Sequence, residues 1–147
     1  MNPINVPHAI MRERVARALQ AALKRAGLTL EVLQEATIRF PDYMPTADIV
    51  LFEYRRQRKS IPSADARLAV EICDTTHRDD FGDKRMRYAA GRLAEYWIVD
   101  IPGRHIHRFE KPGRNGFREA PIVAAGARCE SLTLPGPSIA TKDLPWD

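Results

Sequence analysis

The sequence predicts an α/β protein whose mixed β-sheet carries helices on its faces. Three observations support this prediction. Residues 10–26 have the apolar spacing of a helix, residues 68–100 form a strand–loop–helix–strand unit, and several other runs have strand character. Strands divided around one crossover helix are typical of a mixed sheet with flanking helices.

The bulk composition fits one soluble domain spanning residues 1–147. The chain is 44% apolar and 29% charged, which is ordinary for a globular protein. No apolar run approaches the roughly 20 residues that span a bilayer, and no signal-like run begins the chain. We therefore expect a cytoplasmic protein without a membrane segment. Two cysteines, Cys73 and Cys129, are too few for a disulfide framework and are expected to be reduced.

The N-terminal half should contain one helix and two strand regions. Two prolines in residues 1–8 indicate a loosely ordered start, and residues 10–26 then form an amphipathic helix that stops at Gly27. Residues 29–40 suggest one or two short strands. Residues 47–52 read as a buried strand with Asp48 near its beginning. The polar and basic residues 53–66 indicate a hairpin-type connection or a flexible loop.

The central unit places ionisable residues around one strand and one helix. The apolar run 68–70 carries Glu71 at its end. Asp80, Lys84 and Tyr88 recur every fourth residue, so we expect them to share one helix face. Aromatic and β-branched residues at 96–99 predict a buried strand.

The C-terminal part should be a strand followed by turns and extended arms. Residues 104–109 indicate a strand, on which His105 and His107 share a face. Because no cysteine or further acid is apparent beside them, we do not expect a zinc site there. Pro112 to Gly116 form a turn, and five of the eleven prolines lie from Pro112 onward, which argues against a helix.

Asp48 and Glu71 are the first candidates for chemistry. Each is a carboxylate in or beside a run that should be buried, which is costly unless the acid is paired or binds a metal. If the two strands are neighbours, the two acids can converge and offer hard oxygen ligands to Mg²⁺ or Mn²⁺. Alternatively, each acid faces solvent at a strand end.

Lys84 strengthens the metal hypothesis. It follows the Glu71 strand closely and could point back to the strand end, where it could orient water or stabilise charge on a phosphate. The alternative is an ordinary helical pair with Asp80. Tyr88 is expected mainly to anchor the helix by packing, and the isolated histidines His8 and His77 are weak signals for metal ligands.

The net charge of +4 permits a polyanionic partner without requiring one. The densest basic run contains Arg55, Arg56, Arg58 and Lys59. Either it contacts nucleic acid or it is a solvated loop. Arg78 lies near the predicted active end and could join it.

Residues 47–100 resemble the Uma-type family of restriction endonucleases in the PD-(D/E)XK nuclease superfamily. The matching segments are Ala-Asp-Ile-Val at 47–50, Val-Glu-Ile-Cys at 70–73, Asp80, Lys84, Tyr88, Gly91 and Glu-Tyr-Trp-Ile-Val-Asp at 95–100. The run 95–100, at its spacing from Lys84 and Tyr88, is the most specific part. Residues 104–109 are similar to the family's following strand.

The resemblance implies a restriction-endonuclease-like fold and metal-dependent hydrolysis of phosphodiesters, with DNA the favoured substrate. Carried over by position, Asp48, Glu71 and the backbone carbonyl of Ile72 would bind Mg²⁺ or Mn²⁺. The superfamily lysine normally lies two residues after the acid, where this chain has Cys73. The resemblance therefore assigns the cationic role to Lys84.

Supporting roles would fall to Glu13 in the first helix and to Asp80 and Tyr88. Ala47 stands where the motif prefers proline. A homodimer is compatible with cutting two strands. Because Cys73 replaces the usual lysine, the alternative is a catalytically inactive nuclease-like fold that binds nucleic acid or a protein; a scaffold without a ligand is a third hypothesis.

Overall fold

A computed structural model describes residues 5–74 and 80–147, and its order of elements follows the predicted pattern. The elements are α1 Val6–Arg25, β1 Glu31–Arg39, β2 Thr46–Phe52, β3 Ile61–Pro62, β4 Ala66–Cys73, α2 Asp83–Ala90, β5 Glu95–Asp100, β6 His105–Gly113, β7 Gly116–Glu119, β8 Val123–Ala124, β9 Arg128–Glu130 and β10 Ser138–Ala140. Short 3-10 turns cover Ser63–Asp65 and Thr141–Asp143.

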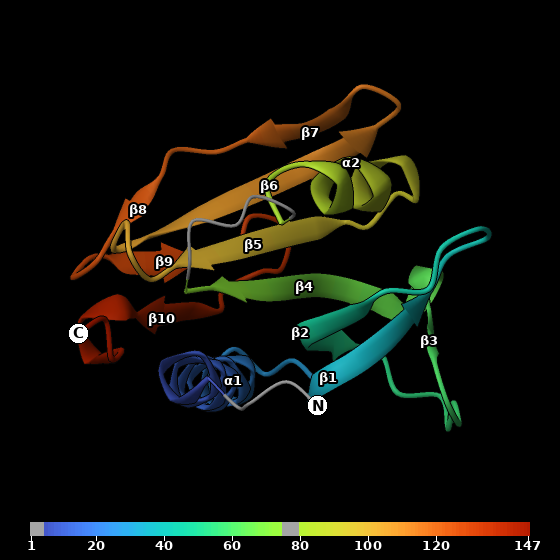
Figure 1. Cartoon of the computed structure of the whole chain (residues 1–147). Helices are drawn as coiled ribbons and strands as arrows, with labels where there is room; N and C mark the ends of the chain where they lie inside the picture. The colour runs from blue at the N-terminus through green and yellow to red at the C-terminus, as the bar shows by residue number, and fades with distance from the viewer. Residues whose placement is uncertain (1–4, 75–79) are drawn as a thin grey trace.

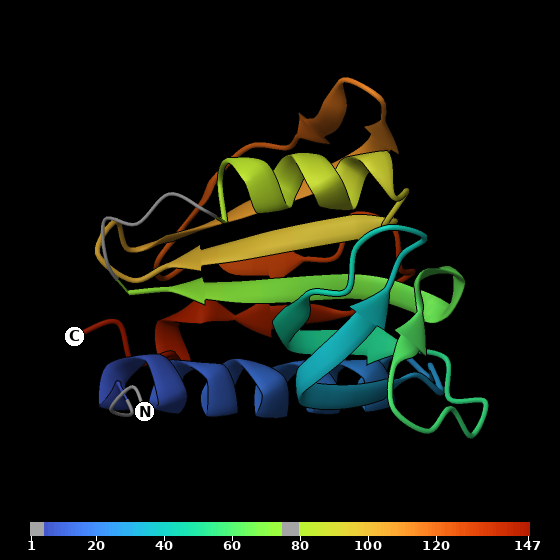
Figure 2. The ribbon, with the colours of Figure 1, turned by 45° about the vertical axis from the view of Figure 1, so that its right-hand side comes forward.

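The main sheet is mixed, as the sequence predicted. Its strand order is β3-β1-β2-β4-β5-β6-β7, and β8 pairs with β6. The β4–β5 pair is parallel and is joined through α2, whereas β2 and β6 run antiparallel to their neighbours. Helix α1 covers one face and α2 the other (Figures 1 and 2). The β9–β10 ribbon forms a separate two-stranded sheet.

Helix α1 begins at Val6, four residues earlier than predicted. The side chain of Asn5 caps it by accepting a hydrogen bond from the backbone N–H of His8 (3.1 Å), and Pro7 lies in the first turn, where its missing N–H costs nothing. Pro7 therefore lies within the start of the helix instead of preventing it. As a consequence, His8 is held on a rigid element.

Strand β4 separates the two cores. Leu68, Val70 and Ile72 pack into the core on the α1 side, whereas Ala69 and Cys73 pack into the core on the α2 side. Glu71 shares the alternation of Ala69 and Cys73, so its carboxylate lies on the α2 face. The predicted position at the end of the strand was wrong, because β4 continues for two residues beyond Glu71.

Residues 29–40 contain one strand, β1, in agreement with one of the two predicted alternatives. Two other segments differ from the sequence prediction. Residues 53–66 include β3, which pairs in parallel with β1. Helix α2 begins at Asp83, so Asp80 precedes the helix and does not share its face with Lys84. No helix in the described part of the chain combines the length and apolar character needed to cross a bilayer.

Candidate active site

Asp48 and Glu71 lie side by side on neighbouring strands. The register pairs Ile49 of β2 with Val70 of β4, and the next step along both strands brings the two acids opposite each other. The backbone N–H of Asp48 donates to Glu71 Oε1 (2.9 Å), and the backbone N–H of Ile72 donates to Asp48 Oδ2 (2.7 Å). Two backbone donors thus fix both carboxylates where the β2–β4 ladder ends.

Helix α2 supplies two side chains to the same carboxylate. Lys84 Nζ forms an ion pair with Glu71 Oε2 and also donates to the carbonyl of Thr46 (3.1 Å). The hydroxyl of Tyr88 donates to Glu71 Oε2 (3.2 Å), and the Tyr88 side chain is fully buried. Lys84 and Tyr88, one turn apart, therefore both face the end of β4. Tyr88 packs as expected but also makes a polar contact with Glu71.

His8 belongs to this site, although the sequence analysis gave it only as a weak signal for a metal ligand. Its Nε2 lies 3.2 Å from Asp48 Oδ2. The pair is 40 positions apart in sequence and depends on the early start of α1, so only the Asn5-Pro7 helix-start signal could have pointed to it. Glu13, the acid considered in this helix, instead accepts hydrogen bonds from Arg17 (2.7 Å) and Gln34 (2.9 Å).

The two carboxylates differ in acidity. Burial raises the pKa of Glu71 to about 8, against the opposing charge of Lys84. Burial also acts to raise the pKa of Asp48, but the hydrogen bonds from His8 and Ile72 outweigh it and hold that pKa below its ordinary value. Near neutral pH, Asp48 is thus an anion, whereas burial opposes ionisation of Glu71 and the positive charge of Lys84 beside it favours ionisation.

The pKa values of the two basic partners, His8 and Lys84, are both raised. The hydrogen bond to Asp48 raises the pKa of His8 against the effect of burial. Burial acts to lower the pKa of Lys84, but the charge of Glu71 outweighs it and raises the pKa. Both side chains are therefore suited to carry positive charge beside the two acids.

A pocket of about 450 Å³ opens beside Lys84. It is lined by Tyr43, Pro45, Thr46, Asp80, Asp83 and Lys84. Asp80 thus stands at the pocket even though it precedes α2, and its backbone carbonyl accepts a hydrogen bond from Tyr96 (2.9 Å). Solvent and a ligand can therefore approach the Lys84 side of the carboxylates.

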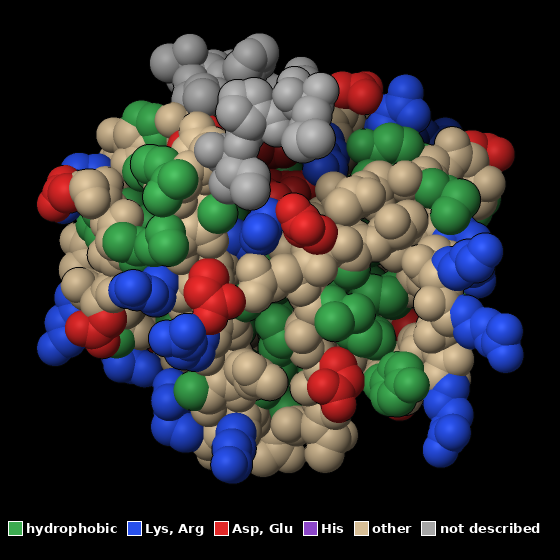
Figure 3. Space-filling model, turned by 60° about the horizontal axis from the view of Figure 1, so that its bottom comes forward, with side chains coloured by type: hydrophobic (Ala, Val, Ile, Leu, Met, Phe, Trp, Pro, Cys, Tyr) green, Lys and Arg blue, Asp and Glu red, His purple; other side chains and the backbone are tan. Residues whose placement is uncertain are grey.

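The basic run lies away from this pocket. Arg55, Arg56, Arg58 and Lys59 follow the end of β2 that is remote from Asp48, and the four steps along the strand from Asp48 to Phe52 span about 13 Å. Arg55 is also bound to Asp65 (3.0 Å) and Glu53 (3.1 Å). Arg78 lies outside the described residues. On the face in Figure 3, Lys and Arg side chains gather toward two opposite sides of the face.

The donor set suits a hard divalent cation. Among the described residues, the hydrogen bonds of the Asp48 carboxylate use Oδ2, so Oδ1 keeps its lone pairs. The N–H and C=O of a residue in an extended strand point to the same side, so the Ile72 carbonyl faces Asp48 as its N–H does. Two carboxylates and one carbonyl are the oxygen ligands that Mg²⁺ or Mn²⁺ prefers.

Comparisons with known proteins identify the family and the fold of the chain. The Uma2 family, described as "Putative restriction endonuclease", matches residues 1–142. Among solved structures, the chain is similar to "a putative nuclease belonging to DUF820" from Anabaena variabilis, with a TM-score of 0.67 and 14% identity over 97% of this chain and 82% of that one. This likeness shows the shared fold. No curated protein matches the chain. The family description supports a nuclease function, and the chain belongs to the Uma2 family of restriction-endonuclease-like proteins.

Proposed function

We propose that residues 1–147 act as one metal-dependent endonuclease domain that hydrolyses phosphodiester bonds in DNA. The observation that carries this proposal is the convergence of Asp48, Glu71 and Lys84 at one end of the sheet, beside an open pocket. The family description agrees with it. The sequence departs from the superfamily pattern at Cys73, but Lys84 brings a cation to the same carboxylate from α2.

Asp48, Glu71 and the Ile72 carbonyl would hold Mg²⁺ or Mn²⁺. When bound there, such an ion lowers the pKa of a coordinated water and polarises a phosphoryl oxygen. Asp48, already ionised, provides the first anionic ligand. Glu71 would provide the second anionic ligand, and the N–H of Asp48 keeps the Glu71 carboxylate oriented.

Lys84 would hold the attacking water and neutralise charge that develops on the phosphate. Its ammonium group is positioned by the Thr46 carbonyl as well as by Glu71, so it stays at the mouth of the pocket. Tyr88 orients Glu71 Oε2, and His8 orients Asp48 Oδ2. Asp80, at the pocket wall, is placed to help orient Lys84.

The basic run would bind the DNA backbone away from the scissile phosphate. Phosphates of one strand are about 3.4 Å apart along the duplex axis, so about 13 Å corresponds to about four base pairs. Arg56, Arg58 and Lys59 would then meet phosphates flanking the cut, with Arg78 as a further candidate. A homodimer would supply one site for each strand.

The direct test is cleavage of supercoiled plasmid in Mg²⁺ or Mn²⁺ by wild type and by Asp48→Asn, beside the control Asp143→Asn. Asp143 is an exposed acid on the 3-10 turn Thr141–Asp143. We expect Asp48→Asn to lose cleavage and Asp143→Asn to keep it. Cleavage that survives in both Asp48→Asn and Glu71→Gln would contradict the assignment.

The binding-only alternative gives a different result in the same experiment. A folded wild-type protein that binds DNA in a salt-sensitive manner, without cutting in either metal, would support an inactive nuclease-like binding module. Metal-dependent cleavage excludes that alternative.

A further inference from the structure

A second group of side chains that could ligate a metal lies on the same sheet face, where β5 ends and β6 begins. Asp100 ends β5, and His105 and His107 lie near the start of β6. The antiparallel register pairs Asp100 directly with His105. The expectation that no acid stands near these histidines was therefore wrong, because the acid comes from the neighbouring strand.

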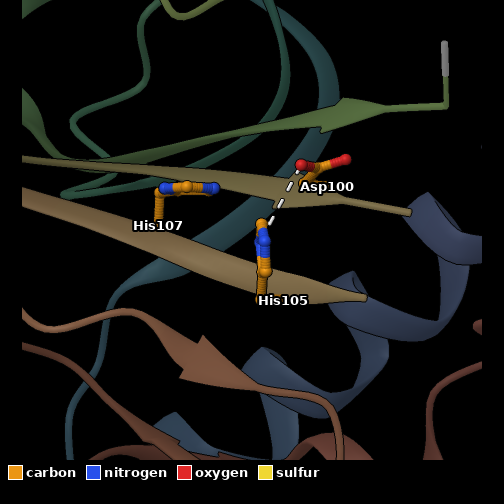
Figure 4. A group of neighbouring side chains, drawn as sticks. All are labelled: Asp100, His105 and His107. Carbon is orange, nitrogen blue, oxygen red and sulfur yellow. Dashed lines mark ion pairs between the residues drawn. The ribbon is translucent and has the colours of Figure 1, made fainter. Parts of the chain in front are cut away.

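The three side chains point into one space. Each can offer one ligand atom so that all three atoms lie within 4.8 Å of one another. Asp100 Oδ2 is 3.8 Å from His105 Nδ1, and the two imidazole rings meet edge to face with centroids 4.7 Å apart. Figure 4 shows the carboxylate and both rings directed toward each other from the two strands.

Two buried nitrogen atoms of this group lack hydrogen-bond partners among the described residues. They are His105 Nδ1 and His107 Nε2. Burying a polar atom without a partner is unfavourable, so each such atom calls for an explanation. A metal ion between the rings would accept both lone pairs and remove that cost.

The surrounding contacts orient the ligands as in known metal sites. His107 Nδ1 lies 3.1 Å from Glu119 Oε1, which holds the ring in the tautomer that leaves Nε2 free to bind a metal. The backbone N–H of Gly103 donates to Asp100 Oδ1 (3.1 Å) and leaves Oδ2 facing His105. A Cβ at Gly103 would lie 2.5 Å from Asp100 Oδ2, so this tight turn suits glycine.

We propose that Asp100, His105 and His107 form a binding site for a divalent transition-metal ion of the zinc type. Two imidazole nitrogens and one carboxylate suit Zn²⁺ and are poor ligands for Mg²⁺ or Ca²⁺. Ligand atoms around tetrahedral zinc lie about 3.3 Å apart, so small side-chain rotations close the group. The His105 side chain is partly exposed, and a water molecule would take the fourth position.

This site is separate from the pair Asp48 and Glu71. Glu71 pairs with Ile98, and Ile98 pairs with His107, so two strand spacings, about 10 Å, divide the backbones of Glu71 and His107. The sites also differ in chemistry, since the first offers oxygen ligands and the second offers mainly nitrogen. The proposal therefore does not depend on the nuclease function.

Calorimetric titration of the metal-free protein with ZnCl₂ tests the site. Wild type should bind one Zn²⁺ per chain with micromolar or tighter affinity. His105→Gln and His107→Gln should each weaken that binding by at least about 100-fold, and Glu119→Gln, which removes only the orienting contact, by about 10-fold to 100-fold. Co²⁺ in place of Zn²⁺ should give wild type the visible absorption of a four-coordinate site.

His8→Gln is the matched control, because His8 lies beside Asp48 in the other site. This variant should keep the high-affinity Zn²⁺ and the Co²⁺ spectrum. Absence of Zn²⁺ binding by wild type would overturn the proposal. So would loss of binding in His8→Gln together with its retention in His105→Gln and His107→Gln. The Co²⁺ spectrum of wild type decides the question even if a histidine variant fails to fold.

Discussion

Glu95 is the most fully hydrogen-bonded acid in the described structure, and its replacement gives a quantitative test of the fold. The side chain is completely buried at the start of β5. Its Oε1 accepts bonds from Ser131 Oγ (2.7 Å), Thr133 N–H (3.1 Å) and Thr133 Oγ1 (2.7 Å). Its Oε2 accepts from Trp97 Nε1 (2.6 Å) and Leu132 N–H (2.8 Å). One carboxylate thus fastens residues 131–133 to the sheet.

Glu95→Gln keeps the shape but replaces one acceptor oxygen with a donor. The less costly orientation puts the amide nitrogen at the Oε1 position, because the hydroxyls of Ser131 and Thr133 can turn to accept from it. The backbone N–H of Thr133 then has no acceptor, and leaving a buried donor unpaired costs about 1–3 kcal/mol. The remaining hydrogen bonds are also weaker, because their acceptor no longer carries a charge. We expect a total loss of about 2–4 kcal/mol in unfolding free energy.

Urea denaturation of wild type and variant measures this loss. Glu110→Gln is the control, because Glu110 is directly opposite Glu95 on β6 but meets only the exposed Arg118 across the strand pair (3.4 Å). Such a pair contributes about 0–1 kcal/mol. A Glu95→Gln variant within about 0.5 kcal/mol of wild type would refute the reasoning, because surface substitutions already give that value.

Three further predictions concern pH, packing and DNA contacts. Because the folded protein raises the pKa of Glu71 from 4.5 to about 8, the fold retains a proton that the unfolded chain releases in this range. The unfolding free energy of wild type should therefore fall as pH rises from 4.5 to 8, by up to about 1.4 kcal/mol per pH unit. Urea titrations at both ends of this range should show no such fall for Glu71→Gln. An equal pH dependence of unfolding free energy in wild type and Glu71→Gln would contradict this prediction. Gly91→Ala should destabilise by about 1–3 kcal/mol in thermal or urea unfolding, since its Cβ would lie 2.3 Å from the buried ring of Phe40, and an unchanged midpoint would exclude that clash. Replacing Arg58 and Lys59 by alanine should reduce the salt dependence of DNA binding by about two counterions in fluorescence titrations, and an unchanged slope would remove this loop from the interface.

The sequence was sufficient for the order of the main elements along the chain because apolar periodicity is a local property. The run 96–99 and the spacing of Lys84 and Tyr88 correctly indicated β5 and the inward face of α2. The start of α1 was wrong because two prolines suggested a loop, although proline is well tolerated in the first helical turn. The capping contact of Asn5 shows which interpretation applies here.

The contacts of His8 and Asp100 in the two candidate metal-binding groups were missed for a different reason. His8 meets Asp48, and Asp100 meets His105, only through strand register and helix docking. Such contacts join residues through pairing that no single-chain periodicity reveals, so the acid beside His105 was missed although only five residues separate them. The basic run was identified correctly as a charged segment, but its distance from Asp48 follows from the direction of β2.

The most direct test of the central claim is nicking of supercoiled plasmid in Mg²⁺ and Mn²⁺ by wild type, Lys84→Ala and the control Lys142→Ala. Lys142 is an exposed lysine outside the pocket, so its loss leaves the carboxylates unchanged. The account predicts cutting by wild type and Lys142→Ala and its loss in Lys84→Ala. Full cutting by folded Lys84→Ala, or no cutting by wild type in either metal, would contradict it.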